Sequence, residues 1–106
     1  MKLWVDDVRF PPTSEYKWVK SVTDAKDSIM VIELHKQAGF NSEIIELIDI
    51  DHDAGEYAQY GGDYIRLLDW LEETGRNYPI RIHSMNPVGV ANMRAIIQKN
   101  GWREVK

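Results

Sequence analysis

The residues of this sequence that can do chemistry fall into three short stretches. They are "WVDDVR" with Asp6, Asp7 and Arg9, "IDHDAG" with Asp51, His52 and Asp53, and "IHSMNP" with His83, Ser84 and Asn86. Histidines titrate near neutral pH, so two of them can activate a water molecule and protonate a departing oxygen. Carboxylates bind hard cations, and an arginine can hold two phosphate oxygens at once. The set is therefore suited to acid–base chemistry on a ligand that a cation or the arginine holds in place.

Four carboxylates in one site would need compensation. If Asp6, Asp7, Asp51 and Asp53 lie together, their charges repel a phosphate, and Arg9 with one protonated histidine does not balance them. Either a divalent cation, Mg²⁺ or Mn²⁺, binds there, or some of the carboxylates face away. Taken singly, each residue also has a plainer interpretation as a loop residue, a helix cap or a surface histidine.

Each of the three stretches ends a segment with the pattern of a buried strand. Strands are predicted over 2–6, 16–22, 44–51, 78–84 and 102–106, where apolar and β-branched residues gather in short runs. Helices are predicted within 23–40, 61–75 and 86–101. Thr23 and Asn86 are the expected N-caps of the first and third, and glycines end all three.

Strands that alternate with helices predict an α/β fold with a parallel sheet. Ligands of such sheets bind beyond the carboxyl ends of the strands. If the strands that end at Asp6, Asp51 and His83 are neighbours, about 4.8 Å apart, their polar groups fall within about 10 Å of one another. The first connection, about ten residues long, is too short for a crossover helix, so one helix is missing or reduced.

Length and composition indicate one globular domain over residues 1–106, with 43% hydrophobic and 28% charged residues. The absence of cysteine excludes disulfides and thiolate metal sites, and it fits a cytoplasmic location. No segment approaches the ~20 apolar residues of a membrane span. A net charge of −4 argues against bulk nucleic-acid binding but is compatible with a small nucleotide or an RNA end. The sequence does not indicate an oligomeric state.

In order and spacing, "LWVDDVR", "IDIDHDAG" and "IRIHSMNPVG" resemble the motifs of the cyclic-phosphate processing receiver-like domain, a divergent branch of the two-component receiver fold. The resemblance covers Leu3 to about Met93. It implies a flavodoxin-like three-layer sandwich with a five-stranded parallel sheet of order 2-1-3-4-5 and a reduced first crossover helix. This sequence departs from the pattern at Ala54 and at Asp49, which leaves a carboxyl group inside a strand.

The resemblance also implies roles for the polar residues. His52, His83 and Asp51 would be catalytic, Arg9, Ser84 and Asn86 would bind phosphate, and Asp6, Asp7, Asp51 and Asp53 would bind Mg²⁺ or Mn²⁺. The implied substrate is a nucleotide or RNA end that carries a cyclic phosphate.

Three functions stay open at this point. The first is a metal-assisted phosphoesterase that opens a cyclic phosphate. The second is a phosphoacceptor receiver, with Asp51 phosphorylated, Ser84 as the switch hydroxyl and Lys106 as the lysine after the last strand, but it leaves His52 and His83 without a role. The third is a binding module that uses the same pocket without turnover.

Overall fold

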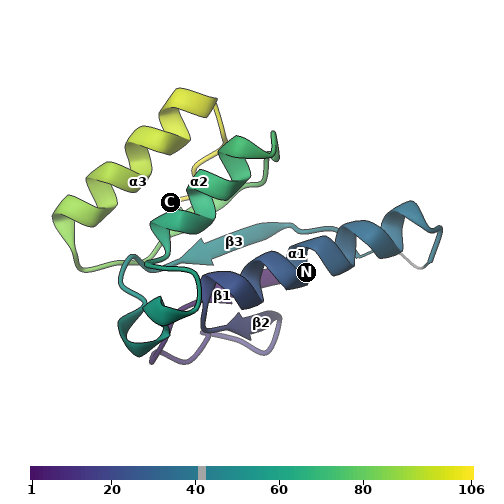
Figure 1. Ribbon diagram of the computed structural model, residues 1–106, viewed down its shortest axis with the longest axis horizontal. Helices are drawn as coiled ribbons and strands as arrows, with labels where there is room; N and C mark the ends of the chain where they lie inside the picture. Colours follow the sequence, from purple (N-terminus) through teal and green to yellow (C-terminus); the bar gives the residue numbers. More distant parts are fainter. Residues whose placement is uncertain (41–42) are drawn as a thin grey trace.

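The computed structural model describes residues 1–40 and 43–106. Its strands are β1 (Lys2–Val5), β2 (Tyr16–Val19), β3 (Leu47–Ile50) and β4 (Ile80–Ile82). Its helices are α1 (Val22–Gln37), α2 (Ile65–Glu73) and α3 (Pro87–Asn100), with a short 3₁₀ helix, η1 (Gly55–Gln59), before α2 (Figure 1). The chain thus has an α/β fold. No helix of the described residues is long and apolar enough to cross a bilayer.

All described strand pairs are parallel, in the order β2-β1-β3-β4. The sheet has four strands where the sequence predicted five. In place of a strand over 102–106, the chain makes one isolated parallel bridge between Ile80 and Glu104. Because β4 has only three residues, it offers a short edge for a further strand to pair with. The neighbouring strands β1, β3 and β4 place the three polar stretches side by side.

The predicted three-layer sandwich is corrected to two layers. Crossover connections between parallel strands are right-handed. The chain moves in one direction along the sheet, from β2 to β3 and then from β3 to β4. The helices α1, α2 and α3 therefore lie on the same face of the sheet. In agreement, α2 packs against both α1 and α3 (Figure 1). A helix on the other face would belong to the connection from β1 to β2, which contains none.

The two faces of the sheet therefore differ in character. Alternate strand residues, among them Leu3, Val5, Ile48 and Ile50, form the hydrophobic core with the helices. In register on the opposite face lie Trp18, Trp4, Asp49 and Arg81, one from each strand. We call this side the helix-free face.

Two helix starts differ from prediction. Helix α1 is capped by Ser21, whose hydroxyl accepts the backbone N–H of Asp24 at 3.0 Å, whereas the predicted cap Thr23 donates its hydroxyl to the Tyr60 carbonyl. Helix α2 begins at Ile65 rather than near 61, because Gly61 and Gly62 both have positive φ angles. At α3 the prediction is confirmed: Asn86 caps the helix.

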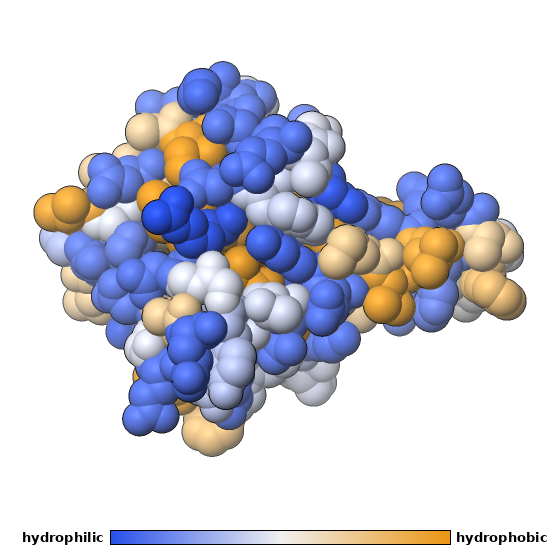
Figure 2. Space-filling view, in the orientation of Figure 1, coloured by the Kyte–Doolittle hydropathy of each residue, from blue (hydrophilic) through white to orange (hydrophobic). Residues whose placement is uncertain are grey.

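Helix α1 projects beyond the sheet. Its buried residues, Val22, Ala25, Ser28 and Ile29, all lie in its first half. Exposed apolar side chains follow, namely Met30, Val31, Leu34, Phe40 and Ile44. Figure 1 shows the far end of α1 reaching past the other elements, and Figure 2 shows apolar surface on this projection. The first half of α1 thus anchors the helix, while the second half has little to pack against.

Candidate functional site

Three carboxylates converge at the carboxyl edge of the sheet. One oxygen each of Asp6, Asp7 and Asp51 lies within 4.8 Å of the others. Burial raises the pKa of Asp7, and the neighbouring charges of Asp6 and Asp51 raise it further. Such crowding of negative charge is the situation that a bound cation relieves, so the donor set fits Mg²⁺ or Mn²⁺.

The carboxylate of Asp6 is fully buried and has three polar contacts. Its Oδ1 accepts the backbone N–H groups of Val8 and Arg9, both at 2.9 Å, and its Oδ2 lies 2.9 Å from His83 Nε2. Burial opposes ionisation, but the N–H groups of Arg9 and Val8 and the His83 ring outweigh it and lower the pKa of Asp6. Asp6 is therefore a buried anion that fixes the turn after β1.

His83 lies between two buried carboxylates. Its Nε2 faces Asp6, and its Nδ1 is 2.6 Å from Asp49 Oδ1. The ring stacks on Trp4, with centroids 3.7 Å apart and planes at 3°, and 9% of the side chain is exposed. Both ring nitrogens are thus occupied by protein groups.

Asp49, which the sequence analysis noted as a carboxyl group inside a strand but gave no role, contacts several residues of the candidate site. It is fully buried within β3, and its Oδ2 accepts from Arg81 at 3.1 Å and from the Tyr16 hydroxyl at 3.3 Å. A network therefore crosses the helix-free face from Tyr16 and Arg81 through Asp49 to His83 and Asp6. The only signal in the sequence was a carboxyl group inside an apolar run.

His52 has a different environment on the other side of the site. Its Nδ1 is 2.8 Å from Asp53 Oδ1 and 3.5 Å from Asn86 Nδ2. The shorter contact indicates that Nδ1 carries a proton toward Asp53, which leaves Nε2 as an acceptor. Among residues 1–40 and 43–106, Nε2 has no hydrogen-bond partner. The ring packs directly on Gly89 of α3, where an added Cβ would lie 2.4 Å from a ring carbon.

The other predicted residues take varied positions. Arg9 is exposed, its backbone carbonyl accepts the Trp4 indole N–H at 2.8 Å, and its guanidinium forms no ion pair in the described part of the chain. The Ser84 hydroxyl accepts the Asn86 N–H, and Asn86 accepts the Gly89 N–H. Asp53, a predicted metal ligand, bonds to His52 and is outside the acidic cluster. Lys106 bonds to Glu104 rather than to the cluster.

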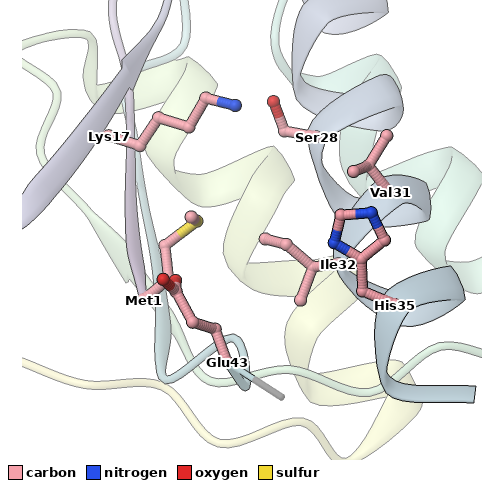
Figure 3. A pocket seen from close by; sticks show the side chains of 7 residues that line it. All are labelled: Met1, Lys17, Ser28, Val31, Ile32, His35 and Glu43. Atoms are coloured by element: carbon pink, nitrogen blue, oxygen red, sulfur yellow. The ribbon is translucent and has the colours of Figure 1, made fainter. Parts of the chain in front are cut away.

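Two hollows of the molecular surface lie along α1. One, of about 350 Å³, is lined by Ser21, Thr23, Asp24, Tyr57 and Tyr60, between the start of α1 and η1. Figure 3 shows another, of about 240 Å³, between α1 and the amino ends of the strands, with Lys17, His35 and Glu43 around apolar walls. None of the predicted site residues lines this second hollow, which is at the opposite edge of the sheet from the acidic cluster.

Comparison with known proteins adds one finding. The family model described as the cyclic-phosphate processing receiver domain matches residues 1–99. Neither a curated protein nor a solved structure gives a significant match. The match spans all three polar stretches, so the expected family is confirmed.

Proposed function

Since the chain belongs to the family of cyclic-phosphate processing receiver domains, we propose that it binds and hydrolyses the cyclic phosphate of a nucleotide or RNA end. The observation that carries this proposal is the convergence of Asp6, Asp7 and Asp51, with His52 directly after Asp51 in the chain. In the reaction, water adds to phosphorus, one ring P–O bond breaks, and the product is a phosphomonoester with a free hydroxyl.

Metal binding is part of the proposal. Asp7 and Asp51, with Asp6, would hold Mg²⁺ or Mn²⁺. When bound, such a cation neutralises charge on the phosphate oxygens and stabilises the departing oxygen. The exposed Arg9 guanidinium, which is close in sequence to Asp6 and Asp7, would bind the phosphate oxygens.

The two histidines take different roles in this proposal. His52 would remove the proton from the attacking water through Nε2, with Asp53 holding Nδ1–H so that the ring keeps the correct tautomer. The departing oxygen would take its proton from solvent. His83, with both nitrogens occupied, would instead be a positioning residue that holds Asp6 in place.

The decisive experiment follows ring opening of nucleoside 2′,3′-cyclic phosphates by phosphorus NMR, with and without Mg²⁺. We expect Mg²⁺-dependent opening that His52→Ala and Asp7→Asn reduce at least a hundredfold. His35→Ala and Asp27→Asn are matched controls, because both residues are exposed on α1 and should leave the rate unchanged.

Other outcomes point to the other functions. Ligand-dependent shifts without ring opening in any metal would overturn hydrolysis and favour a binding module. Stable phosphorylation of Asp51 by acetyl phosphate, with no effect of cyclic nucleotides, would favour a phosphoacceptor receiver. The bond between Lys106 and Glu104 counts against that last alternative.

A further inference from the structure

The hollow between α1 and η1 has the properties of a small-molecule subsite. Its volume of about 350 Å³ is at the lower end of ligand pockets, about 300–1,000 Å³. Tyr57 and Tyr60 contribute aromatic walls, with ring centroids 6.3 Å apart, and polar groups of Ser21, Thr23 and Asp24 complete the lining. Aromatic walls with a few polar groups are the usual means of holding a nucleobase.

The hollow is held in a fixed shape. The Tyr60 carbonyl accepts both the backbone N–H of Thr23 at 3.1 Å and its hydroxyl at 2.9 Å, which ties the end of η1 to the first turn of α1. The chain then passes so close to α1 at Gly61 that an added Cβ would lie 3.0 Å from Val22. Tyr60 is thereby held in place although 52% of it is exposed.

The hollow also adjoins the acidic cluster. At Gly55, the first residue of η1, an added Cβ would lie 2.4 Å from Asp7 Oδ2, so the backbone rests on this carboxylate. Tyr57 follows two residues later, about 4 Å further along a 3₁₀ helix. From the other side, the buried Tyr64 hydroxyl donates to the Lys20 carbonyl at 2.7 Å, directly before Ser21. The η1 segment thus borders both the hollow, through Tyr57 and Tyr60, and Asp7 of the acidic cluster, through Gly55.

The ammonium group of Lys20 lies near the aromatic rings of Trp18 and Tyr57. Lys20 Nζ lies 4.5 Å from the centroid of the Trp18 ring and 6.0 Å from that of Tyr57. The Trp18 indole in turn donates to the Asp6 carbonyl at 2.7 Å. Aromatic rings beside a basic side chain, next to a phosphate site, match the chemistry of a base joined to a phosphate.

We infer that this hollow binds the nucleobase next to the cyclic phosphate, with the base stacked on the exposed Tyr60 ring and the Tyr57 ring, inclined by 46°, against its edge. The inference rests on the proposed function and adds to it the residues that hold the base. Loss of a stacked aromatic ring weakens nucleotide binding about tenfold.

The experiment compares two substrates that share the five-membered cyclic phosphate but differ in the base. These are a nucleoside 2′,3′-cyclic phosphate and glycerol 1,2-cyclic phosphate. We expect Tyr60→Ala to raise KM for the nucleoside about tenfold and to leave KM for the glycerol compound unchanged. Tyr60→Phe should behave as wild type, and Phe40→Ala is the control for loss of an exposed aromatic ring elsewhere.

Tyr57 gives an independent test, but it is partly buried against the core, so Tyr57→Ala is accompanied by a thermal unfolding measurement and by Tyr57→Phe. If Tyr60→Ala changed KM by the same factor for both substrates, the subsite would be overturned. If neither substrate is opened, the proposed hydrolysis fails, and titration with a nucleoside 3′-monophosphate then decides the subsite alone. Shifts of the Tyr57 and Tyr60 ring signals would support it, and their absence would overturn it.

Discussion

His83 and Asp6 show that a residue's chemistry depends on what surrounds it. The imidazole is stacked on Trp4 and bonded at both nitrogens to buried carboxylates. Removing it would leave the buried carboxylates of Asp6 and Asp49 without the ring that contacts both of them. We expect His83→Ala to lower the free energy of unfolding by about 3 kcal/mol, measured by urea denaturation.

The exposed His35 provides the control, since His35→Ala should change stability by less than about 0.5 kcal/mol. If His83→Ala kept full stability but lost all turnover, His83 would be catalytic rather than positioning.

The stability of the protein at acidic pH depends on a few carboxyl groups whose pKa values are lowered in the folded state. Burial works against ionisation of Asp6, but backbone N–H groups and His83 lower its pKa below the ordinary 3.8. Arg76 and Tyr78 lower the pKa of Glu33 despite partial burial. Because the folded pKa values lie below the unfolded ones, this stabilisation is present at neutral pH and is lost as pH falls through the folded values. We expect the free energy of unfolding to decline below about pH 4, and a flat profile down to pH 3 would contradict this.

Asp7 behaves in the opposite sense. Burial and the charges of Asp6 and Asp51 raise its pKa, so ionised Asp7 costs stability once the pH exceeds its folded pKa. A cation would remove that cost, and protons would compete with it. We expect Mg²⁺ to raise Tm more at pH 7 than at pH 4.

The variant Asp7→Asn separates the two effects in this thermal measurement. Without metal it should raise Tm at pH 7, and with Mg²⁺ it should show little further rise. An equal response of the wild type and the variant to Mg²⁺ would place the cation elsewhere.

At the scale of elements, α3 leaves room for the His52 ring because Gly89 has no side chain. Gly89 lies in the first turn of α3, and the His52 ring occupies the space of its missing Cβ. The added methyl group would displace the His52 ring, and the preference of helices for alanine over glycine, about 1 kcal/mol, offsets that cost only in part. We expect Gly89→Ala to lower thermal stability and to reduce kcat/KM at least tenfold in protein that is still folded.

The matched control is Val88→Ala, on an exposed neighbour in the same turn. Unchanged turnover in Gly89→Ala would show that the position of the His52 ring does not matter for the reaction.

The sequence predicted these elements well where local chemistry sets them. Asn86, Pro87 and Gly101 mark both ends of α3 because a cap, a fixed φ and a left-handed residue act within one turn. Thr23 was predicted as the cap of α1, but Ser21 is the cap, because only the three-dimensional path of the chain shows which hydroxyl meets a free N–H.

The candidate site was predicted less completely than the helices. Strand alternation placed Asp6, Asp51 and His83 at one edge, and the family motifs pointed to the same residues. The contact between His83 and Asp49 could not be predicted from the strand pattern, because it depends on which face of the sheet carries no helix. The prediction of a fifth strand over 102–106 was wrong because apolar residues such as Trp102 are buried there without belonging to a β-ladder.

On the scale of the whole molecule, packing is uneven along α1. Its first half is buried against the sheet and α2, whereas side chains from Met30 onward are largely exposed. Helical hydrogen bonds without tertiary packing open more easily. We expect amides of residues 34–37 to exchange hydrogen at least tenfold faster than those of 26–29, measured by NMR. Equal protection along the helix would mean that something covers its far end.

The long separation between Asp6 and His83 has a consequence for synthesis on the ribosome. Strands β1 and β2 emerge first, and their pairing needs only residues 2–19. Asp51 follows after β3, and His83 comes 77 residues after Asp6. Until then the carboxylate of Asp6 lacks its ring partner, and water must solvate it. A nascent chain that stops before β4 therefore holds its first acidic pair in an open, hydrated turn, and the site becomes complete only when β4 takes its place at the edge of the sheet.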